Sequence, residues 1–288
     1  MRRNFLSLRR NIAKAVSRYG LAWFYPFRLI NNALISLLKS DFAIVQGRKM
    51  FLDPKDNLCL SISDTCEPLE TELVKSSVKE GQVVVDIGAN IGYYTLLFAE
   101  LVGKGGKVFA FEPNPDNFSL LSKNVSANGF ENVVLVNKAV SDMTGPIKLY
   151  ISKRNCGDHR IYDYGERRRV IEVGSVRLDD YFRDFEGKID FIKMDIQGAE
   201  LLAVRGMPSL LEKNKDIKMV TEFWPIGLNN SGARPEDYLN TLKGLGFRLM
   251  HLANEEEEFG LIDESRLLKN YTIANGRHTD LFCMREER

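Results

Sequence analysis

The stretch VVVDIGANIGYYT, residues 83–95, decides the fold class of this chain. It starts with an apolar, β-branched run that ends in an acid and a glycine, which is typical of a buried strand in a parallel sheet. Gly88 and Gly92 predict a tight turn after this strand, and the residues from about 91 to 102 predict a helix. A strand, a glycine turn and a helix in this order predict an open α/β sheet with a ligand site at the turn.

The same alternation continues along the chain. Strands are predicted at 83–88, 107–113, 133–140, 189–196 and 218–225, and helices at 91–102, 115–128, from about 199 and at 235–245. Two closing strands, FRLMHLA and TDLFCMR, are predicted with only the acidic turn Glu255–Glu258 between them. This pattern predicts a doubly wound, mostly parallel α/β sheet with helices on both faces and an antiparallel edge strand.

The segments outside this alternation set the domain organisation. Residues 1–60 are predicted to form a basic helical arm, broken at Pro26, and a short hairpin over 42–60 with Gly47-Arg48 as its turn. Residues 61–288 are predicted to form the main domain, which starts with a helix at about 68–79. Within it, two strands and a polar loop interrupt the alternation, so we predict an inserted antiparallel excursion over 141–175.

Charge narrows the classes of partner. The net charge is +1, so no overall field favours nucleic acid. Residues 1–40 hold eight basic residues and no acid, so the remainder carries 1 − 8 = −7. The arm fits either packing on the main domain or on a second subunit of a homo-oligomer, or contact with an anionic membrane surface through its aromatic residues.

The length of the apolar runs and the spacing of the cysteines and histidines indicate the cellular compartment and bear on metal binding. No apolar run reaches the roughly 20 residues that span a bilayer, and the four cysteines form no C-x-x-C pair. We therefore expect a cytoplasmic protein, either free or peripheral to the inner face of the membrane. No two of the three histidines lie three to five residues apart, so we predict no histidine-based metal site.

Acids at two strand ends indicate the ligand. The turn reads G-x-N-x-G, which differs from the G-x-G-x-x-G of dinucleotide folds, and its glycines would let backbone approach a ligand. Asp86 offers a carboxylate to a cationic amino acid, and Glu112, twenty residues after Gly92, lies where an acid binds a ribose. Singly, Asp86 could be a helix cap, the glycines a turn and Glu112 a surface acid. Together they indicate a nucleoside linked to a cationic amino acid.

Four segments give the chain a resemblance to a known family. They are DIGANIGYYTLLFA (86–99), VFAFEPNPDNFSLLSKNVSANG (108–129), NKAVSD (137–142) and IDFIKMDIQGAELLAVRGM (189–207). In this order they resemble the FkbM-type methyltransferases, which have the class I, Rossmann-like fold. The resemblance covers roughly residues 83–210, continues weakly through EFWP at 222–225, and leaves the first 60 residues uncovered. It implies S-adenosylmethionine as the methyl donor and a hydroxyl of a sugar, glycan or natural product as the acceptor.

The resemblance also implies roles for single residues. The methionine end and the glycine loop would be lined by Asp86, Gly88, Ala89, Asn90 and Gly92, with Tyr93 closing over them. Glu112 would bind the ribose, Pro113 and Asn114 would lie beside the adenosine, and Ala139 and Val140 near the adenine. Asp195 would lie beneath the methyl group. The family usually reads D-x-E-G-x-E there, whereas Gln197 in this chain removes a charge next to Asp195.

Three side chains are candidates for accepting the proton of the acceptor hydroxyl or for orienting the acceptor: Asp195, Glu222 and His159. Each has a plainer alternative, which is cofactor positioning for Asp195, a salt bridge for Glu222 and a solvated loop position for His159. A metal held by Asp195 and Glu222 would lack a supporting histidine. The basic residues of the loop 153–169 either hold an acidic or phosphorylated acceptor or form a solvated face.

Three other classes of protein compete with a methyltransferase. An NAD-dependent oxidoreductase needs a third glycine and a hydride site, and the sequence has neither in place. Aminopropyl transfer would need more acids around a polyamine. A non-catalytic or membrane-associated binding protein with a nucleotide fold would have no reason to keep Asp86, Gly88, Gly92 and Glu112 together.

Overall fold

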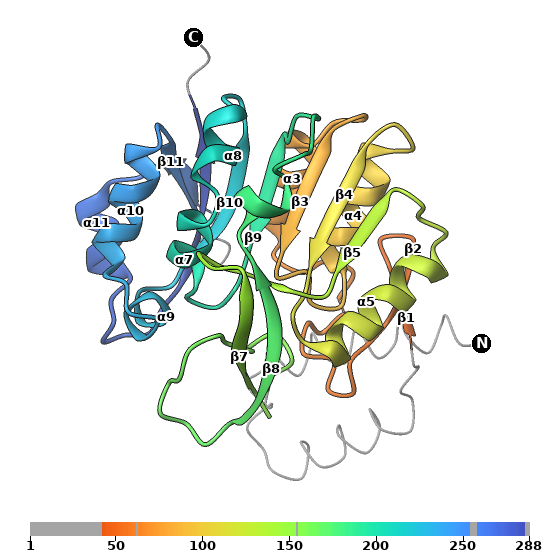
Figure 1. Ribbon diagram of the computed structural model, residues 1–288, viewed down its shortest axis with the longest axis horizontal. Helices are drawn as coiled ribbons and strands as arrows, with labels where there is room; N and C mark the ends of the chain where they lie inside the picture. The colour runs from red at the N-terminus through yellow and green to blue at the C-terminus, as the bar shows by residue number, and fades with distance from the viewer. Residues whose placement is uncertain (1–41, 62, 154, 254–257, 286–288) are drawn as a thin grey trace, which may run out of the picture.

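The computed structural model describes residues 42–61, 63–153, 155–253 and 258–285. Its centre is an eight-stranded sheet in the order β12-β11-β13-β10-β9-β3-β4-β5 (Figure 1). The strands are β3 (Val83–Ile87), β4 (Lys107–Phe111), β5 (Val133–Val136), β9 (Phe191–Met194), β10 (Lys218–Phe223), β11 (Arg248–Ala253), β12 (Glu258–Leu261) and β13 (Thr279–Met284). The five strands from β5 to β10 are parallel, and β13 runs antiparallel between β10 and β11. The predicted fold class is confirmed.

Helices cover both faces of the sheet because the strands are apolar on both sides. Val84 packs into one core with α3 (Pro68–Ser77), α4 (Tyr93–Val102) and α5 (Pro115–Ala127). Val85, the next residue along β3, packs into the opposite core. The helices of that second layer are α6 (Leu178–Tyr181), α7 (Glu200–Arg205), α8 (Pro208–Lys213), α9 (Pro225–Asn230), α10 (Pro235–Gly244) and α11 (Glu264–Asn270).

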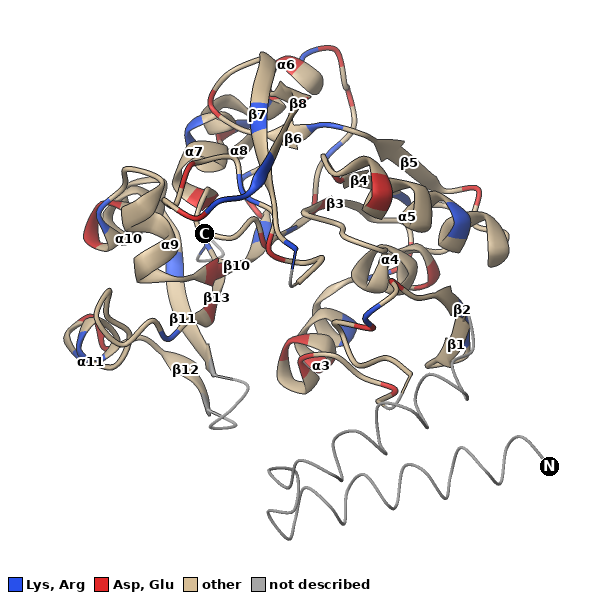
Figure 2. Cartoon of the chain, turned by 90° about the horizontal axis from the view of Figure 1, so that it is seen from below, with Lys and Arg blue, Asp and Glu red and all other residues tan. Residues whose placement is uncertain are grey.

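The strand order places the ligand site. From β3 the chain moves outward to β4 and β5 on one side, and it later continues through β9 and β10 on the other side. The order therefore reverses between β3 and β9, and ligands of open α/β sheets bind beyond the carboxyl ends of the strands at such a reversal. Figure 2 looks onto this edge from below, with α3 on one side and the insertion on the other.

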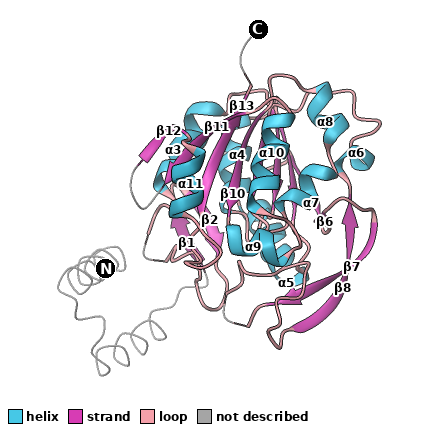
Figure 3. Cartoon of the chain, turned by 90° about the vertical axis from the view of Figure 1, so that its left-hand side faces the viewer, coloured by secondary structure: helices cyan, strands magenta, loops and turns pink. Residues whose placement is uncertain are grey.

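The segment predicted as an insertion contains one antiparallel strand pair and one parallel pair, and its first strand begins earlier than predicted. The predicted strand 133–140 is split into β5 and β6 (Ala139–Val140), and β6 leaves the main sheet to join β8 (Arg169–Val176) and β7 (Gly145–Ile151). The break lies at Asn137, whose side-chain amide donates to the Glu112 carbonyl at 2.7 Å and so ties the chain to the end of β4. The ribbon of β7 and β8 projects past the carboxyl ends of the parallel strands (Figures 1 and 3).

Other boundaries also differ from the prediction. The helix predicted from about 199 is two short helices, α7 and α8, because Pro208 begins a new one. Between β11 and β13 the chain forms β12 and α11 rather than only a turn, while residues 254–257 lie outside the described residues.

The predicted hairpin is present as β1 (Phe42–Val45) and β2 (Arg48–Phe51). Its turn is Gln46-Gly47, one residue earlier than predicted, because both residues have the positive φ that a two-residue hairpin turn favours. The hairpin is attached to α5 through Asn124, whose side chain bonds both the N–H and the carbonyl of Phe51 at 2.6 and 3.1 Å.

Residues 1–40, the predicted arm, lie outside the described residues, so membrane contact or a second subunit there stays a prediction. Within the described ranges, no helix is long and apolar enough to cross a bilayer.

Candidate active site

A cavity lies beyond the carboxyl ends of β3, β4 and β9, at the reversal of strand order. Of the predicted cofactor residues, those that line it are Asp86, Gly88, Ala89, Asn90, Tyr93, Glu112, Pro113, Ala139, Val140 and Asp195. Gly92 and Asn114 are not among the lining residues. The loop after the hairpin adds Asn57, Leu58, Cys66 and Glu67, which the sequence did not indicate.

The two glycines also have a packing role that the sequence did not indicate. Gly88 has φ +84°, and a Cβ there would lie 2.0 Å from the carbonyl oxygen of Asp195. Gly92 has φ +98°, and a Cβ there would lie 2.7 Å from a methyl group of Leu121. The missing side chains therefore allow the turn to pack against the end of β9 and against α5, and Gly88 also lines the cavity directly.

Asp86 is a buried carboxyl at the end of β3. One oxygen accepts a hydrogen bond from the Thr95 hydroxyl at 2.6 Å, and the other, Oδ1, is buried without a partner. Burial raises the pKa of Asp86 to about 6. An unsatisfied buried carboxylate oxygen is costly in the free protein, and a cationic ligand would satisfy it.

Glu112 is held by backbone on both sides. Its two oxygens accept from the N–H of Asn90 at 2.9 Å and of Asn114 at 2.8 Å. Burial raises the pKa of Glu112 to about 7, although these hydrogen bonds oppose the shift. The side chain of Asn114 caps α5 by accepting from the N–H groups of Asp116 and Asn117, so it is turned away to the helix.

Tyr93 lines the cavity and is anchored through its hydroxyl group. Its hydroxyl oxygen accepts from the Cys66 N–H at 3.1 Å and the Gln46 side-chain amide at 3.2 Å, and it shares a 3.1 Å hydrogen bond with Thr71. The ring joins α4 to the loop after the hairpin.

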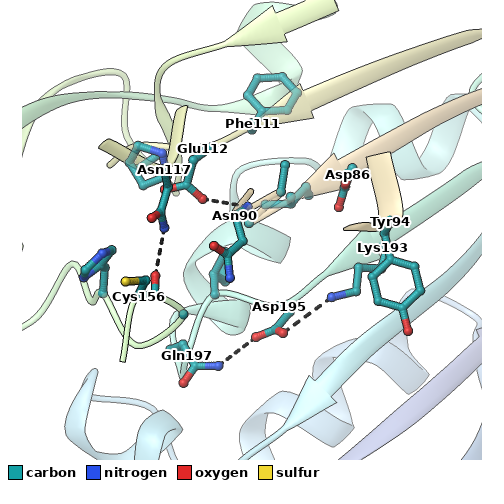
Figure 4. Close-up of a pocket in the computed structure, with 18 of the residues that line it drawn as sticks. Asp86, Asn90, Tyr94, Phe111, Glu112, Asn117, Cys156, Lys193, Asp195 and Gln197 are labelled. Carbon is teal, nitrogen blue, oxygen red and sulfur yellow. Dashed lines mark hydrogen bonds and ion pairs between the residues drawn. The ribbon is translucent and has the colours of Figure 1, made fainter. Parts of the chain in front are cut away.

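Asp195 is held from both sides in the cavity (Figure 4). Lys193 Nζ lies 3.4 Å from Oδ2, and the side-chain amide of Gln197 donates to Oδ1 at 2.8 Å. An ionised glutamate at position 197 could not donate this hydrogen bond. The departure from the family pattern therefore replaces a repelling neighbour of Asp195 with a donor.

The comparison with known proteins agrees with this geometry. The family model of the methyltransferase FkbM domain matches residues 86–249 of the sequence, which is more than half of the chain. The chain belongs to the FkbM methyltransferase family. It therefore carries an S-adenosylmethionine-dependent methyltransferase domain.

Three methyltransferases are similar to about half of this chain. Methyltransferase sdnD of Sordaria araneosa is 27% identical over 186 residues, which cover 53% of this chain and 69% of the relative. The hexuronic acid methyltransferase AglP of Haloferax volcanii is 29% identical over 142 residues, which cover 49% of this chain and 56% of the relative. The 2-O-methyltransferase NoeI of Sinorhizobium fredii is 29% identical over 163 residues, which cover 51% of this chain and 65% of the relative.

His159 lines the cavity of this FkbM domain from the inserted loop. Its Nδ1 faces the backbone N–H of Ser152 at 3.1 Å, and burial lowers its pKa. A neutral ring that accepts at Nδ1 carries its proton on Nε2, so His159 is suited to donate a hydrogen bond and poorly suited to remove a proton.

Glu222 does not line the cavity, although β9 and β10 are neighbours as predicted. Its side chain is buried at the end of β10, and Oε2 has no hydrogen-bond partner. Burial, followed by the charges of Asp195 and Glu200, raises the pKa of Glu222 well above its usual value. The described residues contain no group of three or more His, Cys, Asp or Glu arranged to hold a metal ion.

The basic residues of the inserted loop are partly used within the loop. Asp158 accepts from Arg160 at 2.6 Å and from Arg168 at 2.7 Å. The guanidinium of Arg160 also stacks between Tyr164 and Trp224, with its central carbon 4.7 Å from each ring centroid. The loop thus closes over the end of β10, and these two arginines serve its own structure.

Proposed function

We propose that this domain methylates a hydroxyl group of a small-molecule or glycan acceptor, such as a sugar or a natural product. The observation that carries the proposal is that the carboxyl side chain of Asp195 lines the same cavity as Asp86 and Glu112. The printed names of two relatives, a hexuronic acid methyltransferase and a 2-O-methyltransferase, support a sugar as the acceptor.

The residues present fit S-adenosylmethionine. The unsatisfied oxygen of Asp86 would accept from the α-ammonium group. Each oxygen of Glu112 accepts one N–H and retains a lone pair for a ribose hydroxyl. Ala139 and Val140, which follow β5 next to the end of β4, would contact the adenine, with Pro113 beside the adenosine.

When bound, the cofactor supplies a methyl group on a sulfonium, and its leaving group is a neutral thioether. The chain must therefore align the acceptor oxygen with that methyl and remove the hydroxyl proton. Asp195 takes the proton at its carboxylate, which Lys193 and Gln197 hold in a fixed orientation. His159 donates from Nε2 to orient the acceptor.

Methyl-labelled S-adenosylmethionine with an extract containing candidate acceptors tests this function, with mass spectrometry of the product. We expect a labelled methyl ether with the wild-type protein and at least 100-fold less with Asp195→Asn, since a positioned base contributes about 100- to 10,000-fold. Glu131→Ala, an exposed change, is the control. A labelled ester or amine, or full turnover by Asp195→Asn, would contradict the proposal.

A further inference from the structure

Lys193 is a buried ammonium group with unused hydrogen-bond donors. It is 5% exposed, it lies in β9 among apolar residues, and it lines the cavity. Within the described residues, its Nζ makes one hydrogen bond, to Asp195 at 3.4 Å. It also lies 4.0 Å from Glu70 Oε1 and 4.7 Å from the centre of the Tyr94 ring. An ammonium has three donors, so two remain for another group, and leaving them unused in a buried site is costly.

The position of Lys193 identifies the part of the ligand that it faces. In Figure 4, Glu112 and Asn117 lie at one side of the cavity, and Lys193, Asp86 and Tyr94 lie at the other. A nucleoside whose ribose is bound by Glu112 would extend its remaining part toward Lys193. In S-adenosylmethionine that part is an amino acid, which carries an ammonium and a carboxylate. Asp86 matches the first of these charges, and a buried cation matches the second.

A second lysine, Lys138, also lines the cavity, but it does not face the amino-acid part of the ligand. Lys138 follows β5, and β5 is separated from β3 and β9 by β4. It therefore lies on the adenosine side of Glu112. Among the described lining residues, Lys193 is the lysine at the amino-acid side.

We propose that Lys193 binds the α-carboxylate of S-adenosylmethionine, in addition to its contact with Asp195. This inference rests on the proposed placement of the ribose at Glu112. The carboxylate would take the two donors that Asp195 leaves unused, and Asp86 would receive the neighbouring ammonium group.

The charges around Lys193 are compatible with an incoming carboxylate. Burial lowers the pKa of Lys193, but Asp195 and the neighbouring glutamates outweigh it and raise the pKa well above the usual value, so the group is an ammonium. Burial also raises the pKa of Glu67 and of Glu70, so both carboxyls bind a proton more readily than an exposed glutamate does.

The test compares two ligands by isothermal titration calorimetry at neutral pH. S-adenosylmethionine has the amino-acid part, and 5′-methylthioadenosine has the same nucleoside and sulfur without it. In Lys193→Met we expect S-adenosylmethionine to bind about 10- to 100-fold more weakly, the range for a lost charge-assisted hydrogen bond. Methylthioadenosine should bind within about twofold of wild type, because it never reaches Lys193. Lys107→Met, at the amino end of β4 and therefore at the other end of the strands from the cavity, should change neither affinity.

Two results would overturn the inference: unchanged affinity for S-adenosylmethionine, or an equal loss for both ligands, which would indicate a structural role. Partial recovery in Lys193→Arg would support it, because an arginine can still bind a carboxylate. If Lys193→Met has no cooperative thermal transition, Lys193→Gln replaces it in the same comparison. Failure of the wild-type protein to bind S-adenosylmethionine would instead contradict the proposed placement of the cofactor.

Discussion

At the scale of single residues, the sequence located the acids of the site but not their supports. Asp86, Glu112 and Asp195 each end a parallel strand, and such ends meet at one edge of the sheet, so their shared cavity could be predicted. Lys193 could have been noticed as a charged residue inside an apolar strand. The presence of Glu67 at the site could not have been predicted, because the path of its loop depends on how the hairpin packs against α5. The direction of the Glu222 side chain likewise depends on the packing around β10.

Asp86 leads to a prediction about pH. Its pKa is raised to about 6 in the folded protein, so the folded state holds a proton that the unfolded state releases between about pH 4 and 6. The free energy of unfolding therefore decreases across that window and stays lower above it. In Asp86→Asn without ligand, we expect about 2–3 kcal/mol more stability than wild type at pH 8 and little difference at pH 4. Urea denaturation at both pH values measures this. A difference of the same size at both pH values would show that the charge is not its cause.

At the scale of elements, the sequence predicted the start of a strand or helix correctly where the residues that determine it lie within or next to that element. Asn114 and Pro115 predicted the start of α5, and the structure confirms it. The break between β5 and β6 was missed because VVLVNKAV is apolar on both sides of Asn137, and what separates the two strands is a hydrogen bond to the end of β4. The strand β12 pairs with β11 and was hidden by the acidic segment before it.

The attachment of the hairpin can be tested at Asn124. Its buried side chain bonds Phe51 in β2 and the carbonyl of Ile91 in the glycine turn at 2.7 Å, so it joins three elements. In Asn124→Ala these backbone groups lose their partners, and we expect the free energy of unfolding to fall by about 2–3 kcal/mol. Ser126→Ala, an exposed change on the same helix, should stay within about 0.5 kcal/mol. Equal values for the two variants in urea denaturation would mean that Asn124 does not hold the hairpin.

At the scale of the whole molecule, the chain reverses its strand order between β3 and β9, and the cavity at that reversal, the candidate cofactor site, is lined by segments far apart in the sequence. The acids come from the strand ends, the loop after the hairpin supplies Glu67 and Asn57, and the insertion supplies His159 and Cys156. The latter two segments also contact each other, since Cys156 Sγ lies 3.6 Å from Asp53. The residues that line the cavity therefore come from segments between the loop after the hairpin and the start of α7.

Calorimetric binding of S-adenosylmethionine to wild type and to Glu112→Ala tests the central claim, that this cavity holds the cofactor with its ribose on Glu112. Glu112→Ala removes two hydrogen bonds to the ribose, so we predict an affinity at least 10-fold weaker. The exposed control Glu131→Ala should bind as wild type does, and a thermal transition confirms that each variant is folded. Equal affinity in folded Glu112→Ala and wild type would contradict the account.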